Sequence, residues 1–246
     1  ISISSTFRDY SVYWSRSTSE AVSISMKSEF PSYVVVDKNV LESWPELVES
    51  FAGAPFLAIE ASEKLKNLDT VGTVASWLIA QGASKTSQVI AIGGGFVQDV
   101  VTFTADVYYR GVPWVFVPTT LLAMCDSCIG GKCALNQSGH KNQLGVINPP
   151  RNVSISLEFL KTLSTRDIHS GYAELLKLSL TGANNFYEEL KDHVNLNGLG
   201  LYGLDEMVHK SLLAKKWVIE RDEREENLRR ILNYGHTFGH AIESAS

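Results

Sequence analysis

The chain has 246 residues, of which 44% are hydrophobic and 20% are charged. This composition is typical of a globular protein with a buried core, and the length fits one large domain or two modest ones. The formal net charge of -5 argues against a nucleic-acid surface, because binding to phosphate backbones needs a basic excess or a basic stripe.

Targeting and redox signals point to the inside of a cell. No apolar run is long enough to cross a membrane, and the first ten residues, ISISSTFRDY, lack a basic region followed by an apolar one. The three cysteines lie between Cys125 and Cys133, and an odd number in one short stretch suits a reducing compartment better than a disulfide framework. We therefore expect a cytoplasmic protein without membrane contact, or a plastid protein if the source is a plant.

The first half of the chain alternates short apolar runs with helical patterns. Apolar and β-branched runs predict strands at 32–39, 56–60, 88–92 and 114–118. Helices are expected at 41–51, 70–82 and 96–111. In the second helix, residues spaced as on one helical face predict a buried stripe: Val71, Val74, Ala75, Leu78 and Ile79. Strands that alternate with helices indicate a parallel sheet.

The pattern changes after Pro118. Residues 119–152 are rich in Gly, Asn, Ser and Cys, and we expect a long functional loop there. From about residue 165 the pattern is helical, including a long amphipathic stretch at 204–224. We place a domain boundary near Pro149-Pro150, which gives an α/β domain at 1–150 and a mainly helical domain at 151–246.

Two short segments in the first domain have the chemistry of a nucleotide site. GGGFVQD (93–99) lies between a predicted strand and helix, where backbone N–H groups and the helix N-terminus favour a phosphate. Its spacing differs from G-x-G-x-x-G, so a plain tight turn is an equal alternative. Asp37 and Asn39 close the first predicted strand, where such side chains can bind ribose hydroxyls, although a simple turn also explains them.

The expected loop carries several polar groups around Gly130-Gly131. Asp126, Lys132, Lys141 and Asn142 bring an acid, two cations and an amide together, which suits an anionic substrate. The plainer interpretation is a set of solvated loop side chains.

A second polar cluster lies on the predicted helix that contains AELLK. Glu174 and Lys177 share one helix face, either as a surface ion pair or as a carboxylate ligand beside a cation. A glutamate and two histidines form an accepted catalytic zinc set.

The last segment aligns four polar residues. Arg229, Asn233, His236 and His240 recur at spacings of 4, 3 and 4, which places them on one helical face. Solvated faces usually carry Lys and Glu instead, so this ladder favours a site. HTFGH lacks the glutamate of H-E-x-x-H and is therefore not a protease motif.

The cysteines offer a competing metal site. Cys125, Cys128 and Cys133 read C-x2-C-x4-C, which occurs in zinc and iron–sulfur fragments and in redox pairs. A tetrahedral site would need a fourth ligand such as His140, because the chain contains no other cysteine. Small residues that pack a tight loop are the simpler explanation.

Five segments carry a family resemblance: GGGFVQDVVTFTADVYYRG, VPTTLLAMCDSCIGGKCALN, GHKNQLG, SGYAELLKLSL and DEREENLRRILNYGHTFGHAIE. In this order and spacing they closely resemble 3-dehydroquinate synthase and the wider sugar-phosphate cyclases, from about residue 33 to the end. The resemblance implies a Rossmann-like NAD-binding α/β domain followed by a helical metal-binding domain. It also implies that the family continues for about a hundred residues beyond this sequence.

The resemblance assigns roles to individual residues. It implies NAD contacts at Asp37, Asn39, Glu63, Lys66, Gly94, Gly95, Asp99, Thr119 and Thr120. It implies substrate contacts at Asp126, Lys132, Lys141, Asn142, Lys177, Lys215, Arg229, Asn233 and His240. Glu174 and His236 would bind zinc or cobalt with a third histidine beyond residue 246, and Arg110 would reach into the neighbouring subunit's site of a homodimer.

The implied activity converts 3-deoxy-D-arabino-heptulosonate 7-phosphate to 3-dehydroquinate and phosphate, in the shikimate pathway. Transient oxidation by NAD, phosphate elimination, re-reduction and an intramolecular aldol closure would follow one another. Three alternatives stay open: a related cyclase acting on a sugar phosphate such as sedoheptulose 7-phosphate, a polyol or alcohol dehydrogenase of the iron-dependent group, and an inactive metal-binding fragment. His140 to Gln143 is similar to the sedoheptulose cyclases, whereas Asn233 and His240 favour dehydroquinate synthesis.

Overall fold

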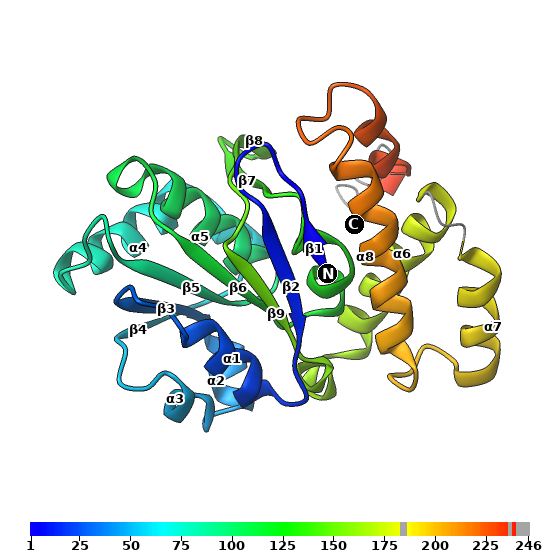
Figure 1. The fold of residues 1–246 in the computed structure, drawn as a ribbon, viewed down its shortest axis with the longest axis horizontal. Coiled ribbons are helices and arrows are strands. Elements are labelled where there is room, and N and C mark those ends of the chain that lie inside the picture. Colours follow the sequence, from blue (N-terminus) through cyan, green and yellow to red (C-terminus); the bar gives the residue numbers. More distant parts are fainter. Residues whose placement is uncertain (183–185, 236–237, 240–246) are drawn as a thin grey trace.

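The computed structural model describes residues 1–182, 186–235 and 238–239, and divides into an α/β part and a helical part that lie side by side (Figure 1). Within these ranges no helix combines the length and the apolar character needed to cross a bilayer. His236 and His240 lie outside the described residues, so their predicted roles stay predictions.

Seven strands within the described ranges form one sheet. Their spatial order is β1 (Ser2–Ile3), β2 (Tyr10–Trp14), β9 (Asn152–Ile155), β6 (Trp114–Pro118), β5 (Gln88–Gly93), β3 (Ser32–Asp37) and β4 (Phe56–Ile59). Only the β1–β2 pair among them is antiparallel. The predicted parallel sheet is therefore confirmed, and its strands end at one common edge.

Helices cover both faces of the sheet (Figure 1). One face carries α1 (Thr18–Met26), α2 (Lys38–Ser43) and α3 (Leu47–Ser50). The other carries α4 (Leu68–Ala80) and α5 (Gly95–Val107), and short 3-10 turns η1 (Glu63–Leu65) and η2 (Tyr108–Arg110) flank this pair. The expected helix at 41–51 is wrong in detail, since Pro45 lies between α2 and α3, where it cannot continue a helix.

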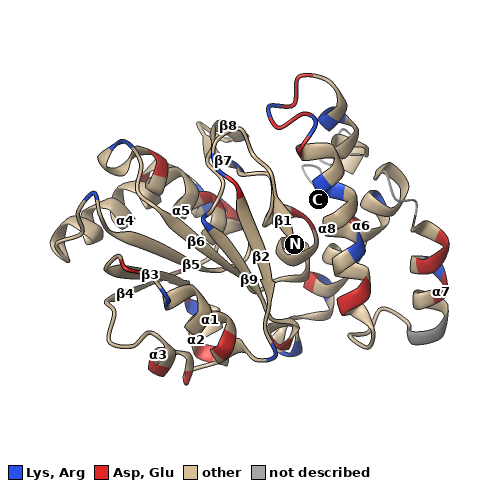
Figure 2. Ribbon diagram, in the orientation of Figure 1, with Lys and Arg blue, Asp and Glu red and all other residues tan. Residues whose placement is uncertain are grey.

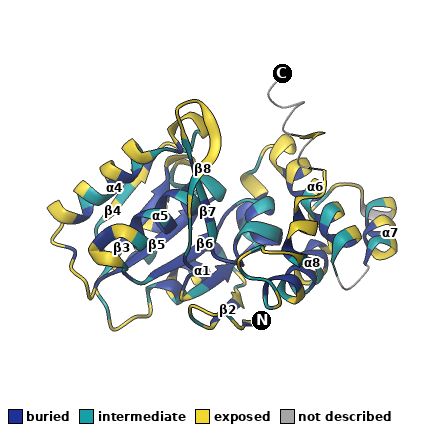
Figure 3. Cartoon of the chain, turned by 90° about the horizontal axis from the view of Figure 1, so that it is seen from above, coloured by how far each residue is buried: buried dark blue, intermediate teal, exposed yellow. Residues whose placement is uncertain are grey.

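Burial follows the layers, with buried central strands and exposed outer helix faces (Figure 3). All six residues of β5 are buried, as expected for a strand covered on both faces. In α4 the expected stripe is narrower than predicted, because Val71, Val74 and Leu78 are buried but Ile79 is 67% exposed. Ile79 is about 80° around the helix from Val71, which puts it at the edge of the stripe.

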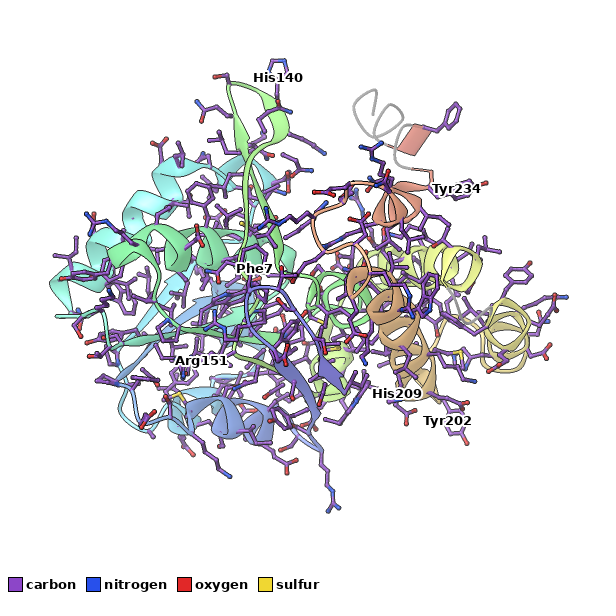
Figure 4. All side chains as sticks on the ribbon, turned by 45° about the horizontal axis from the view of Figure 1, so that its top comes forward. Phe7, His140, Arg151, Tyr202, His209 and Tyr234 are labelled. Atoms are coloured by element: carbon purple, nitrogen blue, oxygen red, sulfur yellow. The ribbon has the colours of Figure 1, made fainter. Side chains whose placement is uncertain are left out.

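The expected loop at 119–152 contains regular structure, so that prediction is wrong. A π-helical turn, η3 (Ala123–Ser127), is followed by an antiparallel hairpin of β7 (Lys132–Gln137) and β8 (His140–Ile147). The connecting residues Ser138 and Gly139 both have positive φ, as tight hairpin turns require. The strands escaped prediction because they are rich in polar residues. His140 lies at the outer end of the hairpin (Figure 4).

The helical part contains η4 (Leu157–Thr162), α6 (Thr165–Thr181), α7 (Tyr187–Asn197), α8 (Leu204–Ile219) and η5 (Leu228–Asn233). The boundary near Pro149-Pro150 stays a prediction; β9, which follows it, still belongs to the sheet. The expected helix through Arg229 and Asn233 is a 3-10 turn instead. It ends before Gly235, whose φ of 82° is outside the helical region.

Candidate active site

The first cavity lies at the edge of the sheet where the parallel strands end. It has a volume of about 470 Å³. Six residues assigned to NAD line it: Asp37, Asn39, Gly94, Gly95, Thr119 and Thr120. They follow β3, β5 and β6, and neighbouring parallel strands bring their ends together. Six of the residues that the resemblance assigns to NAD therefore lie together, because β3, β5 and β6 are neighbours in the sheet.

The glycine segment forms the turn from β5 into α5. Gly94 caps the helix without a side-chain hydrogen bond, so the first backbone N–H groups of α5 are free of a capping side chain. A Cβ atom at Gly94 would lie 2.9 Å from Thr120 Cγ2, whereas one at Gly95 would meet no atom within 4 Å. The close contact explains Gly94 by packing, and the open space at Gly95 leaves room for a ligand against the backbone.

Asp37 ends β3 at the same edge. Its Oδ1 accepts a hydrogen bond of 2.9 Å from Asn39 N, so the carboxylate caps α2. Burial raises the pKa of Asp37, and the Asn39 N–H partly offsets this effect. The second carboxylate oxygen can accept from a ligand hydroxyl, which keeps the ribose interpretation open.

The opposite wall of this cavity was not predicted. It is formed by η4 and the start of α6, with Phe159, Thr162, Leu163, Ser164 and Asp167. These residues follow β9, which pairs in parallel with β6 and therefore delivers its successors to the same edge. The sequence did contain a signal, the short apolar run NVSIS at 152–156, but it was not read as a strand.

The three remaining residues assigned to NAD, Glu63, Lys66 and Asp99, form a separate cluster around the buried Lys66. Lys66 Nζ lies 3.2 Å from Asp99 Oδ2 and 3.5 Å from Glu63 Oε1, and it donates a 3.0 Å hydrogen bond to Asn142 Oδ1. Burial raises the pKa of Asp99 to about 6, although Lys66 opposes the shift. This cluster ties η1 and α5 to the β7–β8 hairpin.

A second cavity, of about 200 Å³, lies where the α/β and helical parts meet. Six residues assigned to substrate binding line it, together with Ser127, Ile129, Glu225 and Leu232: Asp126, Lys132, Lys177, Lys215, Arg229 and Asn233. They come from η3, β7, α6, α8 and η5, which are far apart in the sequence. The structure therefore brings most of the predicted substrate residues together.

Asp126 is the centre of the charge network in this cavity. Its carboxylate lies 2.6 Å from Lys215 Nζ and 3.1 Å from Lys177 Nζ, and Lys215 also donates to the Asp126 carbonyl at 2.6 Å. Burial alone would raise the pKa of Asp126, but the two ammonium groups outweigh it and hold the pKa below its usual range. The carboxylate therefore stays ionised and fixes both lysines.

Glu174, the predicted metal ligand, borders this network from α6. Burial and the nearby Asp126 carboxylate raise its pKa above the usual range. Its Oε2 is buried and pairs with the Lys177 ammonium. A buried carboxylate oxygen that already faces a cation fits a metal ligand. No group of three metal-ligating side chains occurs among the residues described, which exclude His236.

Glu225 was not predicted, although it lines the second cavity. Its carboxylate forms an ion pair with Lys132 and accepts from Asn233 Nδ2. Residues of both charge signs surround it on the segment that follows α8 (Figure 2). It escaped notice because DEREEN reads as a solvated charge run.

Three predicted residues lie away from the second cavity. Asn142 contacts Lys66, and Lys141 lines a smaller cavity between η1 and the tip of the β7–β8 hairpin. Arg110 is exposed, has a φ of 58° and lies at the C-terminal end of α5, away from the edge where α5 begins. If Arg110 serves an active site, the site belongs to another copy of the chain.

The cysteines form packing contacts. Cys125 and Cys128 direct their sulfur atoms to backbone carbonyls at 3.4–3.7 Å, and Cys133 is also buried. Burial raises the pKa of Cys128 and of Cys133 to about 12. The described residues, which include all three cysteines and His140, contain no group of three side chains that could hold a metal, so the geometry disfavours the cysteine metal site.

Comparison with known proteins agrees with this arrangement. The chain is 38% identical over 213 residues to the 3-dehydroquinate synthase of Streptococcus pyogenes serotype M3, which covers 85% of this chain and 59% of that protein. The chain thus spans less than two thirds of the length of this curated relative.

Solved structures of two other cyclases are also similar. A 2-deoxy-scyllo-inosose synthase complexed with carbaglucose-6-phosphate, NAD+ and Co2+ has a TM-score of 0.89 and 30% identity over 100% of this chain and 70% of its own. ValA, a 2-epi-5-epi-valiolone synthase from Streptomyces hygroscopicus with NAD+ and Zn2+ bound, has a TM-score of 0.86 and 27% identity over 98% of this chain and 69% of its own.

Family models give the assignment. The model for the N-terminal part of 3-dehydroquinate synthase matches residues 56–170, and the model for the C-terminal part matches residues 171–246. The two matches are contiguous, and they meet within α6. Since they follow one another in the family's order and together cover residues 56–246, the chain belongs to the 3-dehydroquinate synthase family.

Proposed function

We propose that the protein acts as a 3-dehydroquinate synthase, which converts 3-deoxy-D-arabino-heptulosonate 7-phosphate to 3-dehydroquinate and phosphate. The observation that carries the proposal is the second cavity, where four separate elements supply cations around an ionised Asp126. Such a cavity suits a small substrate with more than one anionic group, as a heptulosonate phosphate has.

The first cavity fits NAD. The start of α5 offers backbone N–H groups to a pyrophosphate, Gly95 leaves space beside it, and the Asp37 carboxylate can accept from a ribose hydroxyl. NAD, when bound, would supply the transient oxidation of a substrate alcohol and the later return of the hydride. The two solved cyclases above carry NAD+ in their structures, which supports this proposal.

Glu174 fits a divalent cation, zinc or cobalt, because its buried Oε2 already pairs with a cation, the Lys177 ammonium. His236 would be a second ligand. The metal would supply Lewis-acid polarisation of substrate oxygens. Lys177, beside Glu174, would orient the same part of the substrate and hold a proton near it.

The other cavity residues would bind and orient the substrate. Lys132 would take the phosphate, and Arg229 and Lys215 the carboxylate, through charge-assisted hydrogen bonds. Fixed by Asp126, Lys215 loses little side-chain entropy on binding. We also propose that Arg110 completes the site of a second copy, which implies a homodimer.

The test is phosphate release from the heptulosonate phosphate with NAD and zinc. Glu174→Gln should lower the rate by about 100-fold or more, because it removes an anionic metal ligand. Glu188→Gln, on the exposed side of α7, is the matched control and should keep the rate. Release that does not depend on NAD, or that persists in Glu174→Gln, would contradict the proposal.

A related cyclase is the second candidate, because 2-deoxy-scyllo-inosose synthase reaches 30% identity over the whole chain. Supplying glucose 6-phosphate or sedoheptulose 7-phosphate in the same assay separates these substrates. A dehydrogenase would instead accumulate NADH without releasing phosphate, and an inactive fragment would bind zinc without turnover.

A further inference from the structure

The N-terminal hairpin of β1 and β2 lies outside the residues matched by the family models, which begin at residue 56. It forms one edge of the sheet, and the turn between its strands carries Phe7 (Figure 4). This turn reaches the segment after α8, where the guanidinium of Arg224 lies 5.6 Å from the Phe7 ring. The hairpin therefore bridges the α/β part and the segment that lines the second cavity.

Tyr10, the first residue of β2, reaches a peptide at the second cavity. Its hydroxyl oxygen accepts a 2.8 Å hydrogen bond from Gly130 N, and the side chain is buried. The carbonyl of the same glycine accepts from both terminal nitrogens of Arg229, at 3.2 and 3.1 Å. The N–H of Gly130 is thus bound by Tyr10 of the N-terminal hairpin, and its C=O is bound by Arg229, a candidate substrate residue.

Gly130 and Gly131 connect Asp126 on η3 to Lys132 on β7. Both have positive φ, of 98° and 63°, which side chains rarely adopt. A Cβ at Gly130 would also lie 2.5 Å from an Arg229 nitrogen. The conformation of this turn therefore sets the positions of Asp126 and Lys132 relative to each other.

The hairpin turn also holds the backbone that Arg229 contacts. The Glu223 carboxylate accepts from Ser5 Oγ at 2.6 Å and from the N–H and hydroxyl of Thr6 at 2.8 and 2.6 Å. The Glu223 carbonyl in turn accepts from Arg229 at 2.6 Å. The N-terminal hairpin therefore holds two residues, Gly130 and Glu223, whose carbonyl groups both accept hydrogen bonds from the buried guanidinium of Arg229.

We propose that the N-terminal hairpin is a positioning element of the substrate cavity and that Tyr10 is its positioning residue. By holding Gly130, Tyr10 fixes the glycine turn and the carbonyl on which Arg229 rests, so the cavity is set for its anionic ligand before that ligand binds. The effect on substrate rests on the proposed function; the effect on the turn does not.

The test uses Tyr10→Phe, which keeps the buried ring and removes one hydroxyl. Tyr13→Phe is the matched control, because Tyr13 lies in the same strand with its side chain 47% exposed. In phosphate-release assays, Tyr10→Phe should raise KM for the heptulosonate phosphate about tenfold, as expected for one lost buried hydrogen bond, and leave KM for NAD unchanged. Tyr13→Phe should match the unmodified protein in both.

Amide hydrogen exchange gives a readout that needs no turnover. Exchange in residues 127–134 and 222–232 should be about tenfold faster in Tyr10→Phe and unchanged in Tyr13→Phe. Unchanged exchange, an unchanged KM for the sugar phosphate, or an equal rise in both KM values would each overturn the proposal. If the unmodified protein releases no phosphate, the proposed function fails, and the exchange result alone decides whether Tyr10 holds the turn.

Discussion

At the scale of single residues, Asp99 gives the protein a pH-dependent stability. Its folded pKa of about 6 is above the value of about 3.9 for an unfolded chain, so the folded state binds the proton more tightly. Burying the ionised Asp99 carboxylate therefore lowers the free energy of unfolding. This destabilisation is absent below about pH 4, grows as pH rises, and is complete above about pH 6. Asp99→Asn removes the charge and with it this pH dependence. The difference in free energy of unfolding, Asp99→Asn minus the unmodified protein, should therefore increase by about 2–3 kcal/mol between pH 4 and pH 7.

Urea denaturation at several pH values measures this difference. Asp69→Asn, at an exposed position in the first turn of α4, controls for the loss of one negative charge. If the stability difference between Asp99→Asn and the unmodified protein were the same at pH 4 and pH 7, the buried carboxylate would carry no such penalty.

Residues of the candidate site differ in how far the sequence could predict them. Asp37, Gly94 and Thr119 follow apolar runs, and the order of parallel strands then places them at one edge. Tyr10 could not be predicted, because its partner Gly130 is 120 positions away and no local pattern links the two residues. Glu225 lies in a charge run whose usual place is the solvated surface, so only tertiary structure reveals its contact with Lys132.

At the scale of elements, the side chain of Asn136 helps to fasten the β7–β8 hairpin to η1. Asn136 Nδ2 donates to the Glu63 carbonyl at 3.0 Å and to its carboxylate at 2.8 Å, while Asn136 Oδ1 accepts from Asn142 N at 3.0 Å. Asn142 has a φ of 55°, a conformation that needs such support. Asn136→Ala should therefore increase amide exchange in residues 136–142 by about tenfold or more.

Gln137→Ala is the matched control, since the neighbouring Gln137 is exposed and its amide contacts only Ser138 among the hydrogen bonds described. It should leave exchange in the hairpin unchanged. Equal protection in Asn136→Ala and the unmodified protein would mean that strand pairing and the contacts of Lys66 hold the hairpin in place without the Asn136 side chain.

The same hairpin shows where element prediction failed. Its strands carry consecutive polar residues at their outer ends, Asn136-Gln137 and His140 to Gln143, so this exposed half offers little apolar periodicity. The central strands β3 and β5 were predicted because they are largely buried and their middle residues are Val, Ile and Ala. Prediction from sequence thus succeeded where burial dictates the residue types.

At the scale of the whole molecule, the two parts meet where α6 packs on the segment after β6. A Cβ atom at Gly171 would lie 2.3 Å from Leu121 Cγ, and three residues later α6 carries Glu174. Gly171→Ala should therefore push α6 away from the α/β part and lower the free energy of unfolding by about 1–3 kcal/mol. Urea denaturation monitored by tryptophan fluorescence measures this change.

Gly72→Ala provides the matched control for the same substitution inside a helix. Gly72 lies in α4, and a Cβ there would meet no atom within 4 Å. With no steric cost, the gain in helix propensity should stabilise the protein by about 0.5–1 kcal/mol. The two substitutions therefore have opposite predicted effects on the free energy of unfolding. A Gly171→Ala protein as stable as Gly72→Ala would show that the interface tolerates an added methyl.

Because α6 carries both Glu174 and Lys177, a displaced α6 should also weaken zinc binding, while Gly72→Ala leaves it unchanged.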